Sequence, residues 1–104
     1  MNANEMGSFF ENMGMMIKAG ITPSEAVDLL KEESEDSGTP NATYGSMSEN
    51  MSMGSSLADA MRSSTAFPDY AVDMVDASEY TGKLEGTLFH LSDYYRTEHS
   101  MRNT

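Results

Sequence analysis

The chain has 104 residues, no cysteine and a formal net charge of −11, which comes from 17 acidic and 6 basic side chains. This length predicts one domain, and the lack of cysteine excludes a disulfide framework and thiol chemistry. So acidic a surface repels nucleic-acid phosphates and anionic lipid headgroups, which are therefore poor partners. No apolar run approaches the length needed to span a bilayer.

Glycine and proline positions divide the chain into six predicted helices, and no segment alternates with the period of two that is typical of a strand. The first helix is expected over about residues 5–18, with Gly20 as its stop. The run Thr22-Pro23-Ser24-Glu25 then resembles a capping box at the start of a second helix. A third helix is expected between Pro40 and Gly54, although its composition favours helix only weakly.

The second half of the chain predicts three further helices. Ser55 is expected to cap a short fourth helix that contains Leu57. The fifth helix is expected to start on Pro68, because proline suits the first helical turn, and to stop at Gly82, which suits a left-handed backbone. Leu84 then opens an amphipathic sixth helix. The sequence thus predicts an all-α, six-helix bundle built from antiparallel helix pairs.

Candidate catalytic and metal-binding residues are few. His90 and Asp93 share one helical face, but a structural zinc site needs four ligands, and the chain has two histidines and no cysteine. Acidic side chains of the last two helices, chiefly Glu79 and Asp93, are weak candidates for a hard cation across a subunit interface, without an EF-hand loop. We therefore expect no catalytic residue, no cofactor and no metal beyond an adventitious Ca²⁺ or Mg²⁺ ion.

The 11 methionines allow two interpretations. Most of them fall on the apolar periodicity of the predicted helices, which favours core positions. Met15 and Met53 do not, and are expected to be exposed. The alternative is an acidic, Met-rich helical module that binds basic peptides or divalent cations, since methionine surfaces adapt to many partner helices.

Several short motifs follow one another in a fixed order along the chain. They are Phe9-Phe10 with Lys18-Ala19-Gly20-Ile21, Glu25-Ala26 with Leu29-Leu30, Gly54-Ser55-Ser56-Leu57-Ala58-Asp59-Ala60, Phe67-Pro68, and Glu79-x-x-Gly82-x-Leu84 running on to Tyr94. Over about residues 9–100 this order resembles the cytoplasmic domain of the type II secretion F family. That family comprises the polytopic inner-membrane platform proteins of type II secretion systems, type IV pili and competence pseudopili.

The resemblance implies a scaffold without enzyme activity at the cytoplasmic face of the bacterial inner membrane. Residues 9–102 would be one helical domain of a longer integral membrane protein, preceded in residues 1–8 by a flexible or added N-terminus. The domain would couple an assembly ATPase to pilin or pseudopilin subunits, together with other platform components, and would meet the membrane only through transmembrane helices outside this segment. The motifs do not distinguish a secretion, pilus or competence machine.

The expected interaction surface combines acidic side chains on polar helix faces with aromatic side chains that exceed the needs of one core face. Its members are Glu32, Asp73, Asp76, Phe10 and Tyr94. The acidic members would meet a basic face of the ATPase. The aromatic members would support a homodimer, because apolar helical patches favour a two-fold contact.

Overall fold

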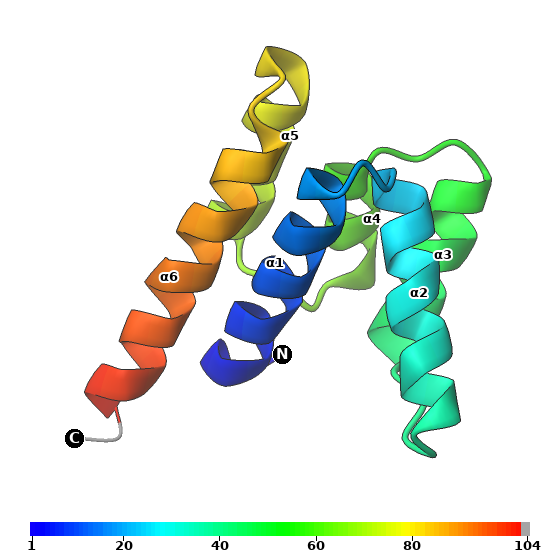
Figure 1. Cartoon of the computed structure of the whole chain (residues 1–104), viewed down its shortest axis with the longest axis horizontal. Helices are drawn as coiled ribbons and strands as arrows, with labels where there is room; N and C mark the ends of the chain where they lie inside the picture. Colours follow the sequence, from blue (N-terminus) through cyan, green and yellow to red (C-terminus); the bar gives the residue numbers. More distant parts are fainter. Residues whose placement is uncertain (103–104) are drawn as a thin grey trace.

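The computed structural model describes residues 1–102, which form six α-helices and no strand (Figure 1). The helices are α1 (Ala3–Lys18), α2 (Pro23–Asp36), α3 (Ala42–Ser52), α4 (Leu57–Ser64), α5 (Asp69–Thr81) and α6 (Leu84–Arg102). The prediction of an all-α, six-helix fold is confirmed. Within residues 1–102, no helix is both long enough and apolar enough to cross a bilayer.

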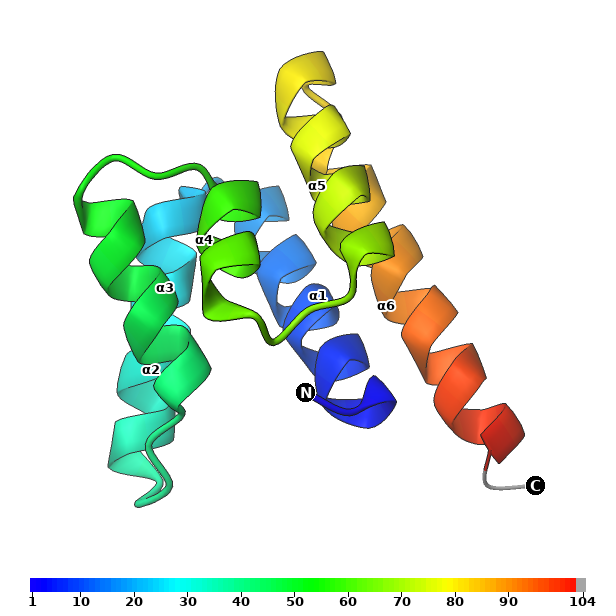
Figure 2. The same ribbon diagram turned by 180° about the vertical axis from the view of Figure 1, so that it is seen from behind.

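The helices form a closed ring. Each helix packs against the helices that precede and follow it in the chain, and α6 returns to pack along α1 in the most extensive of these contacts. Figures 1 and 2 show α2 and α3 on one side, the α5–α6 pair on the other, and α1 and α4 between them. The corner that joins α5 to α6 extends beyond the other helices.

An aromatic cluster around α1 forms the centre of the core. The ring of Phe9 lies 5.1 Å from that of Phe67 and 5.8 Å from that of Tyr44, while the ring of Phe10 stacks on Tyr95 at 5.9 Å. Phe9 and Phe10 are 1 % and 0 % exposed. The expectation that Phe10 contributes to a surface is therefore wrong. Helices pack on more than one face of α1, so both adjacent aromatic residues are enclosed.

The methionines divide between core and surface much as their spacing predicts. Five are buried in the core: Met6, Met13, Met47, Met51 and Met61. Met16 and Met74 are half-buried and pack against the core, whereas Met15 and Met53 are 56 % and 81 % exposed. Methionine thus fills core space here as leucine commonly does.

The starts of the first two helices depend on side-chain caps. At α1, Asn2 accepts a hydrogen bond from the Glu5 N–H at 2.8 Å, and Glu5 accepts one from the Asn2 N–H at 3.0 Å. This reciprocal capping box starts α1 at Ala3, two residues before the expected position. At α2, Thr22 accepts a hydrogen bond from the Glu25 N–H at 3.2 Å, and Pro23 occupies the first helical position as predicted.

Two of the predicted helix starts are displaced by one residue. Ser56, rather than Ser55, caps α4: its hydroxyl accepts a hydrogen bond from the Asp59 N–H at 3.1 Å, while the Ser55 hydroxyl donates to the Ser56 carbonyl. Pro68 has an extended backbone with ψ of 154°, so α5 begins one residue later, at Asp69. Ser55 therefore precedes the cap of α4, and Pro68 is the cap of α5 rather than its first helical residue.

The close packing of α1 on α6 depends on two glycines of α1. A Cβ atom on Gly7 would lie 2.7 Å from Arg96 Cγ, and one on Gly14 would lie 3.1 Å from the ring of Phe89. The buried hydroxyl of Ser92 donates a hydrogen bond to the Gly7 carbonyl at 2.9 Å. Small residues therefore let the first and last helices approach closely, a role that the sequence analysis did not assign to them.

Candidate functional site

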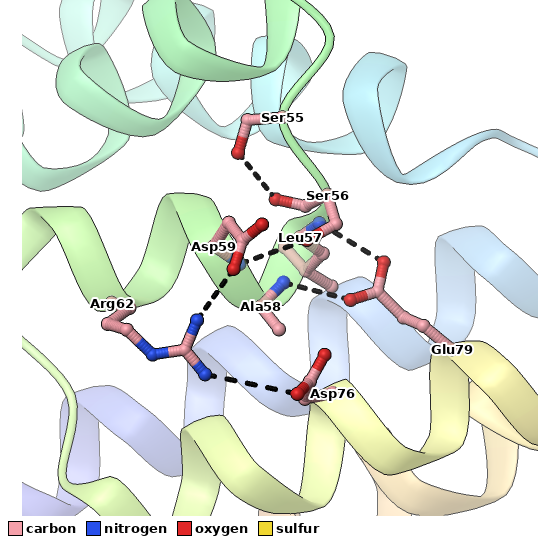
Figure 3. Close-up of polar contacts among 8 residues, drawn as sticks. All are labelled: Ser55, Ser56, Leu57, Ala58, Asp59, Arg62, Asp76 and Glu79. Atoms are coloured by element: carbon pink, nitrogen blue, oxygen red, sulfur yellow. Dashed lines mark hydrogen bonds and ion pairs between the residues drawn. The ribbon is translucent and has the colours of Figure 1, made fainter.

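Glu79, near the C-terminal end of α5, points at the first turn of α4 (Figure 3). Its Oε1 accepts a hydrogen bond from the Ala58 N–H at 2.9 Å, and its Oε2 accepts one from the Leu57 N–H at 3.1 Å. Amides in the first turn of a helix lack partners within the helix and form the positive end of its dipole. A carboxylate from another helix therefore caps α4. It connects the motif that begins at Glu79 to the motif that spans residues 54–60.

A second polar contact between α4 and α5 runs beside this cap (Figure 3). Arg62 Nη1 donates to Asp59 at 2.6 Å, and Arg62 Nη2 lies 4.0 Å from the carboxylate of Asp76. The two helices border a cleft of about 400 Å³, which is lined by Ser56, Asp59, Asp76, Glu79 and Tyr80. The carboxylates of this cleft thus have amide or guanidinium partners.

The acidic residues of the last two helices do not converge. Glu79 lines the cleft between α4 and α5, whereas Asp93 lines a separate groove along α6 with His90. Among the described residues, no group of three or more His, Cys, Asp or Glu side chains is arranged to hold a metal ion. The structure therefore does not bring the two weak cation candidates, Glu79 and Asp93, into one site.

The acidic members of the expected interaction surface lie on two helices. Glu32 on α2 and Asp73 on α5 are exposed. Asp76 is half-buried, and its carboxylate forms an ion pair with Arg62. Among these residues, Glu32 and Asp73 are thus the ones that face solvent most fully.

The greatest density of acidic side chains occurs on α2. Its exposed carboxylates belong to Glu25, Asp28, Glu32, Glu33, Glu35 and Asp36. The single base of this helix, Lys31, lies 3.6 Å from Glu35, and Asp28 accepts a hydrogen bond from the Ser48 hydroxyl at 2.6 Å. The remaining charge gives α2 a strongly negative outer face.

The aromatic surface lies on α6. Tyr94 is 47 % exposed and contacts Tyr70 of α5, with ring centroids 5.1 Å apart. It lines a groove of about 620 Å³ together with His90, Asp93, Thr97, Glu98 and Met101. The adjacent Tyr95 is buried, and this burial raises the pKa of its phenol to about 12. Only one tyrosine of the pair therefore belongs to the surface.

The motif residues occupy helix ends and core positions. Gly20, Gly54 and Gly82 have positive φ angles, Glu25 lies in the first turn of α2, Leu57 and Phe67 are buried, and Leu84 is half-buried at the start of α6. Gly82 has φ of 71°, which is the predicted left-handed helix end. These residues therefore shape the ends of the helices and the core.

Two features of these surfaces were missed by the sequence analysis. Glu79 was assigned to a motif, but its bonds to Leu57 and Ala58 span 22 and 21 residues, and no local spacing signals such a partner. Leu29 was named only as part of a motif and was not expected at the surface, although it is 45 % exposed. Its place outside the apolar stripe that contains Val27 and Leu30 was the available signal.

The chain matches a known protein family. Residues 9–104 match the model of the family described as type II secretion system (T2SS), protein F, so the match covers nearly the whole chain. No curated protein matches the chain.

Proposed function

Since the chain belongs to the type II secretion system protein F family of inner-membrane platform components, we propose that it is the domain through which such a platform engages an assembly ATPase. In this proposal the domain lies at the cytoplasmic face of the inner membrane. It couples the ATPase to pilin or pseudopilin subunits as they are assembled for secretion or pilus formation. The observation that carries the proposal is the exposed acidic surface of α2 and α5.

The way in which the helices are joined supports a coupling role. A part that passes force between two partners must keep its own helices in fixed positions. Glu79 connects α5 to the start of α4, and Ser92 connects α6 to α1 through a buried hydrogen bond. Buried hydrogen bonds of this kind are costly to break, because the separated groups have no water to replace their partners.

The charge of the domain supports a basic partner. Complementary charge raises the association rate and orients the partner, and this contribution weakens as salt screens the charges. Glu32 and Asp73 are well placed for such contacts, because both are exposed on polar helix faces. The partner that we propose is a basic face of the assembly ATPase or of a neighbouring platform component.

Charge reversal tests this proposal. The variants Glu32→Lys and Asp73→Lys should recover less ATPase than the parent domain in a pull-down at low salt, and the difference should shrink at moderate salt. Glu49→Lys, at an exposed position on α3, changes the net charge equally and is the control. Equal recovery by all four proteins at both salt concentrations would contradict an electrostatic docking role for α2 and α5.

We also propose that two copies associate through the aromatic surface of α6. Tyr94 and Tyr70 expose 47 % and 44 % of their surface and already contact each other, so a second copy can cover both rings at once. Sedimentation should show concentration-dependent association that Tyr94→Ser reduces. Tyr80→Ser, which alters an exposed tyrosine at the α5–α6 corner, is the control. A strictly monomeric parent at high concentration would contradict the proposal.

A further inference from the structure

Two large apolar side chains lie exposed beside each other on neighbouring helices. Met15 of α1 is 56 % exposed and Leu29 of α2 is 45 % exposed. Both line a groove of about 190 Å³ between the two helices, whose other lining residues are Asn12, Met16, Leu30 and Glu33. Figure 1 shows α1 and α2 converging toward the short loop that joins them. The surface there offers an apolar depression rather than a flat polar face.

The groove has an acidic border. On a helix the side chains three and four residues away are the neighbours of a given side chain. For Leu29 these include Glu25 on one side and Glu32 and Glu33 on the other, all of them exposed. Glu33 also lines the groove itself. On the α1 side of the groove, Lys18 follows Met15 by one turn and is the single basic residue of that helix. The acidic charge at the border is therefore concentrated on the α2 side.

We propose that this groove binds a large apolar side chain from a basic segment of a partner protein, with flanking lysine or arginine residues meeting the carboxylates of α2. The inference rests on the proposed function, because the groove would be the place where the acidic surface binds its partner. Methionine and leucine can adapt to an aliphatic or aromatic anchor. Such an anchor in an apolar pocket, bordered by charge, is the arrangement that dominates many protein interfaces.

Charge selects this occupant over two others. A second copy that met this groove with its own α2 face would bring the exposed carboxylates of the two helices against each other. An anionic membrane surface would be repelled for the same reason. A basic segment is attracted, and it loses less of its binding energy to desolvation when its charges stay at the border of the groove.

A matched pair of peptides tests the inference directly. The probes are two lysine–alanine peptides of about 14 residues, near the length at which isolated helices form, with leucine or serine at the central position. Both carry the same charge, so any difference between them reports the apolar anchor. The parent chain should bind the leucine peptide about tenfold more tightly, since burial of one large apolar side chain gives a difference of that size.

Variants of the groove complete the test. Leu29→Ser and Met15→Ser should reduce the tenfold preference to nearly none, while Met53→Ser, at an exposed methionine after α3, should keep it. Both groove side chains are largely exposed, and circular dichroism should show that the variants remain folded. Equal binding of both peptides by the parent, or an unchanged preference in Leu29→Ser, would overturn the inference. So would self-association of the parent that Leu29→Ser abolishes.

The ATPase distinguishes failure of this inference from failure of the proposed function. If Glu32→Lys lowers ATPase recovery and Leu29→Ser does not, the charged surface is the docking site and the groove inference is wrong. If the peptide preference depends on Leu29 but neither variant changes ATPase recovery, the groove binds a different basic partner and the proposed function is wrong. Loss of recovery in both variants supports both proposals.

Discussion

Oε1 of Glu79 accepts a hydrogen bond from the backbone N–H of Ala58 at 2.9 Å, so the end of α5 caps the beginning of α4. The second oxygen of the same carboxylate accepts a hydrogen bond from the neighbouring N–H of Leu57, so both oxygens accept a hydrogen bond from α4. Hydrogen bonds to a charged acceptor are stronger than those between neutral groups. This contact therefore fixes the position of α4 relative to the α5–α6 pair more firmly than two hydrogen bonds between neutral groups would.

Removal of the Glu79 carboxylate should destabilise the domain. We expect Glu79→Ala to lower the free energy of unfolding by about 1.5–3 kcal/mol, because two helix-start amides lose a charged acceptor. Glu79→Gln keeps one acceptor oxygen and should lose less. Asp73→Ala, at an exposed position on the same helix, should change stability by no more than about 0.5 kcal/mol. Urea unfolding measures all three, and equal midpoints for Glu79→Ala and the parent would refute the capping role.

The corner between α5 and α6 should require glycine. Gly82 has φ of 71°, where a β-branched residue is strongly disfavoured. Gly82→Val should therefore destabilise the chain by at least about 1 kcal/mol. Nothing lies within 4 Å of a Cβ atom on Gly82, so the cost should come from the backbone rather than from a clash. A thermal midpoint equal to that of the parent would show that the corner tolerates other conformations.

The packing of α1 on α6 should not accept a large side chain at Gly14. A Cβ atom there already meets the Phe89 ring at 3.1 Å, so Gly14→Leu must push the two helices apart. We expect a loss of about 1–3 kcal/mol in the free energy of unfolding. Gly86→Leu is the matched control, because the space around Gly86 in α6 is open. If the two leucine variants unfold at the same denaturant concentration, the close approach of α1 and α6 is not the constraint that we describe.

Alkaline pH should weaken the fold through Tyr95. Burial is the main cause that raises the pKa of this phenol to about 12, with smaller contributions from Tyr94 and Glu98. The unfolded chain loses the proton near pH 10, its ordinary value, while the folded chain keeps it until about pH 12. The stabilising contribution is thus complete below about pH 10 and is lost as the pH rises through this window.

Tyr95→Phe isolates that contribution. Its urea midpoint should fall less steeply between pH 9 and about pH 11 than the midpoint of the parent, because no phenol remains to ionise at this position. The phenylalanine ring keeps the stacking position against Phe10. Parallel pH profiles for the two proteins would mean that Tyr95 ionises without any effect on folding.

The sequence predicted the fold well where the signal is local. Helix boundaries at Gly82 and Pro23 follow from backbone chemistry that acts within a few residues, and the apolar periodicity identified most buried methionines. The one-residue error at Ser55 arose because Ser55 and Ser56 could each serve as the cap. The error at Pro68 arose because the fixed φ of proline suits both the cap and the first helical position. Such choices depend on the path of the loop, which the spacing of side chains does not determine.

The features that spacing could not predict involve residues far apart in the chain. Phe10 was expected at the surface because one helix usually has a single apolar stripe, yet α1 is covered on more than one face. The bond from Ser92 to Gly7 joins positions 85 residues apart. Nothing in a local pattern indicates such a partner. The sequence therefore identified the elements and the chemical character of the surfaces, but not the contacts that hold the elements in place.

The pairing of α1 with α6 also has a consequence for how the chain reaches its native state. The most extensive helix contact joins α1 to α6, so the segment between them must close as one long loop before this contact can form. Contacts of such sequence separation slow folding relative to bundles in which helices meet only their neighbours. We expect amides of α1 to gain full protection from hydrogen exchange only after α6 has emerged. Until then the phenylalanine pair of α1 lacks part of its cover, and the nascent domain is a potential client for chaperones.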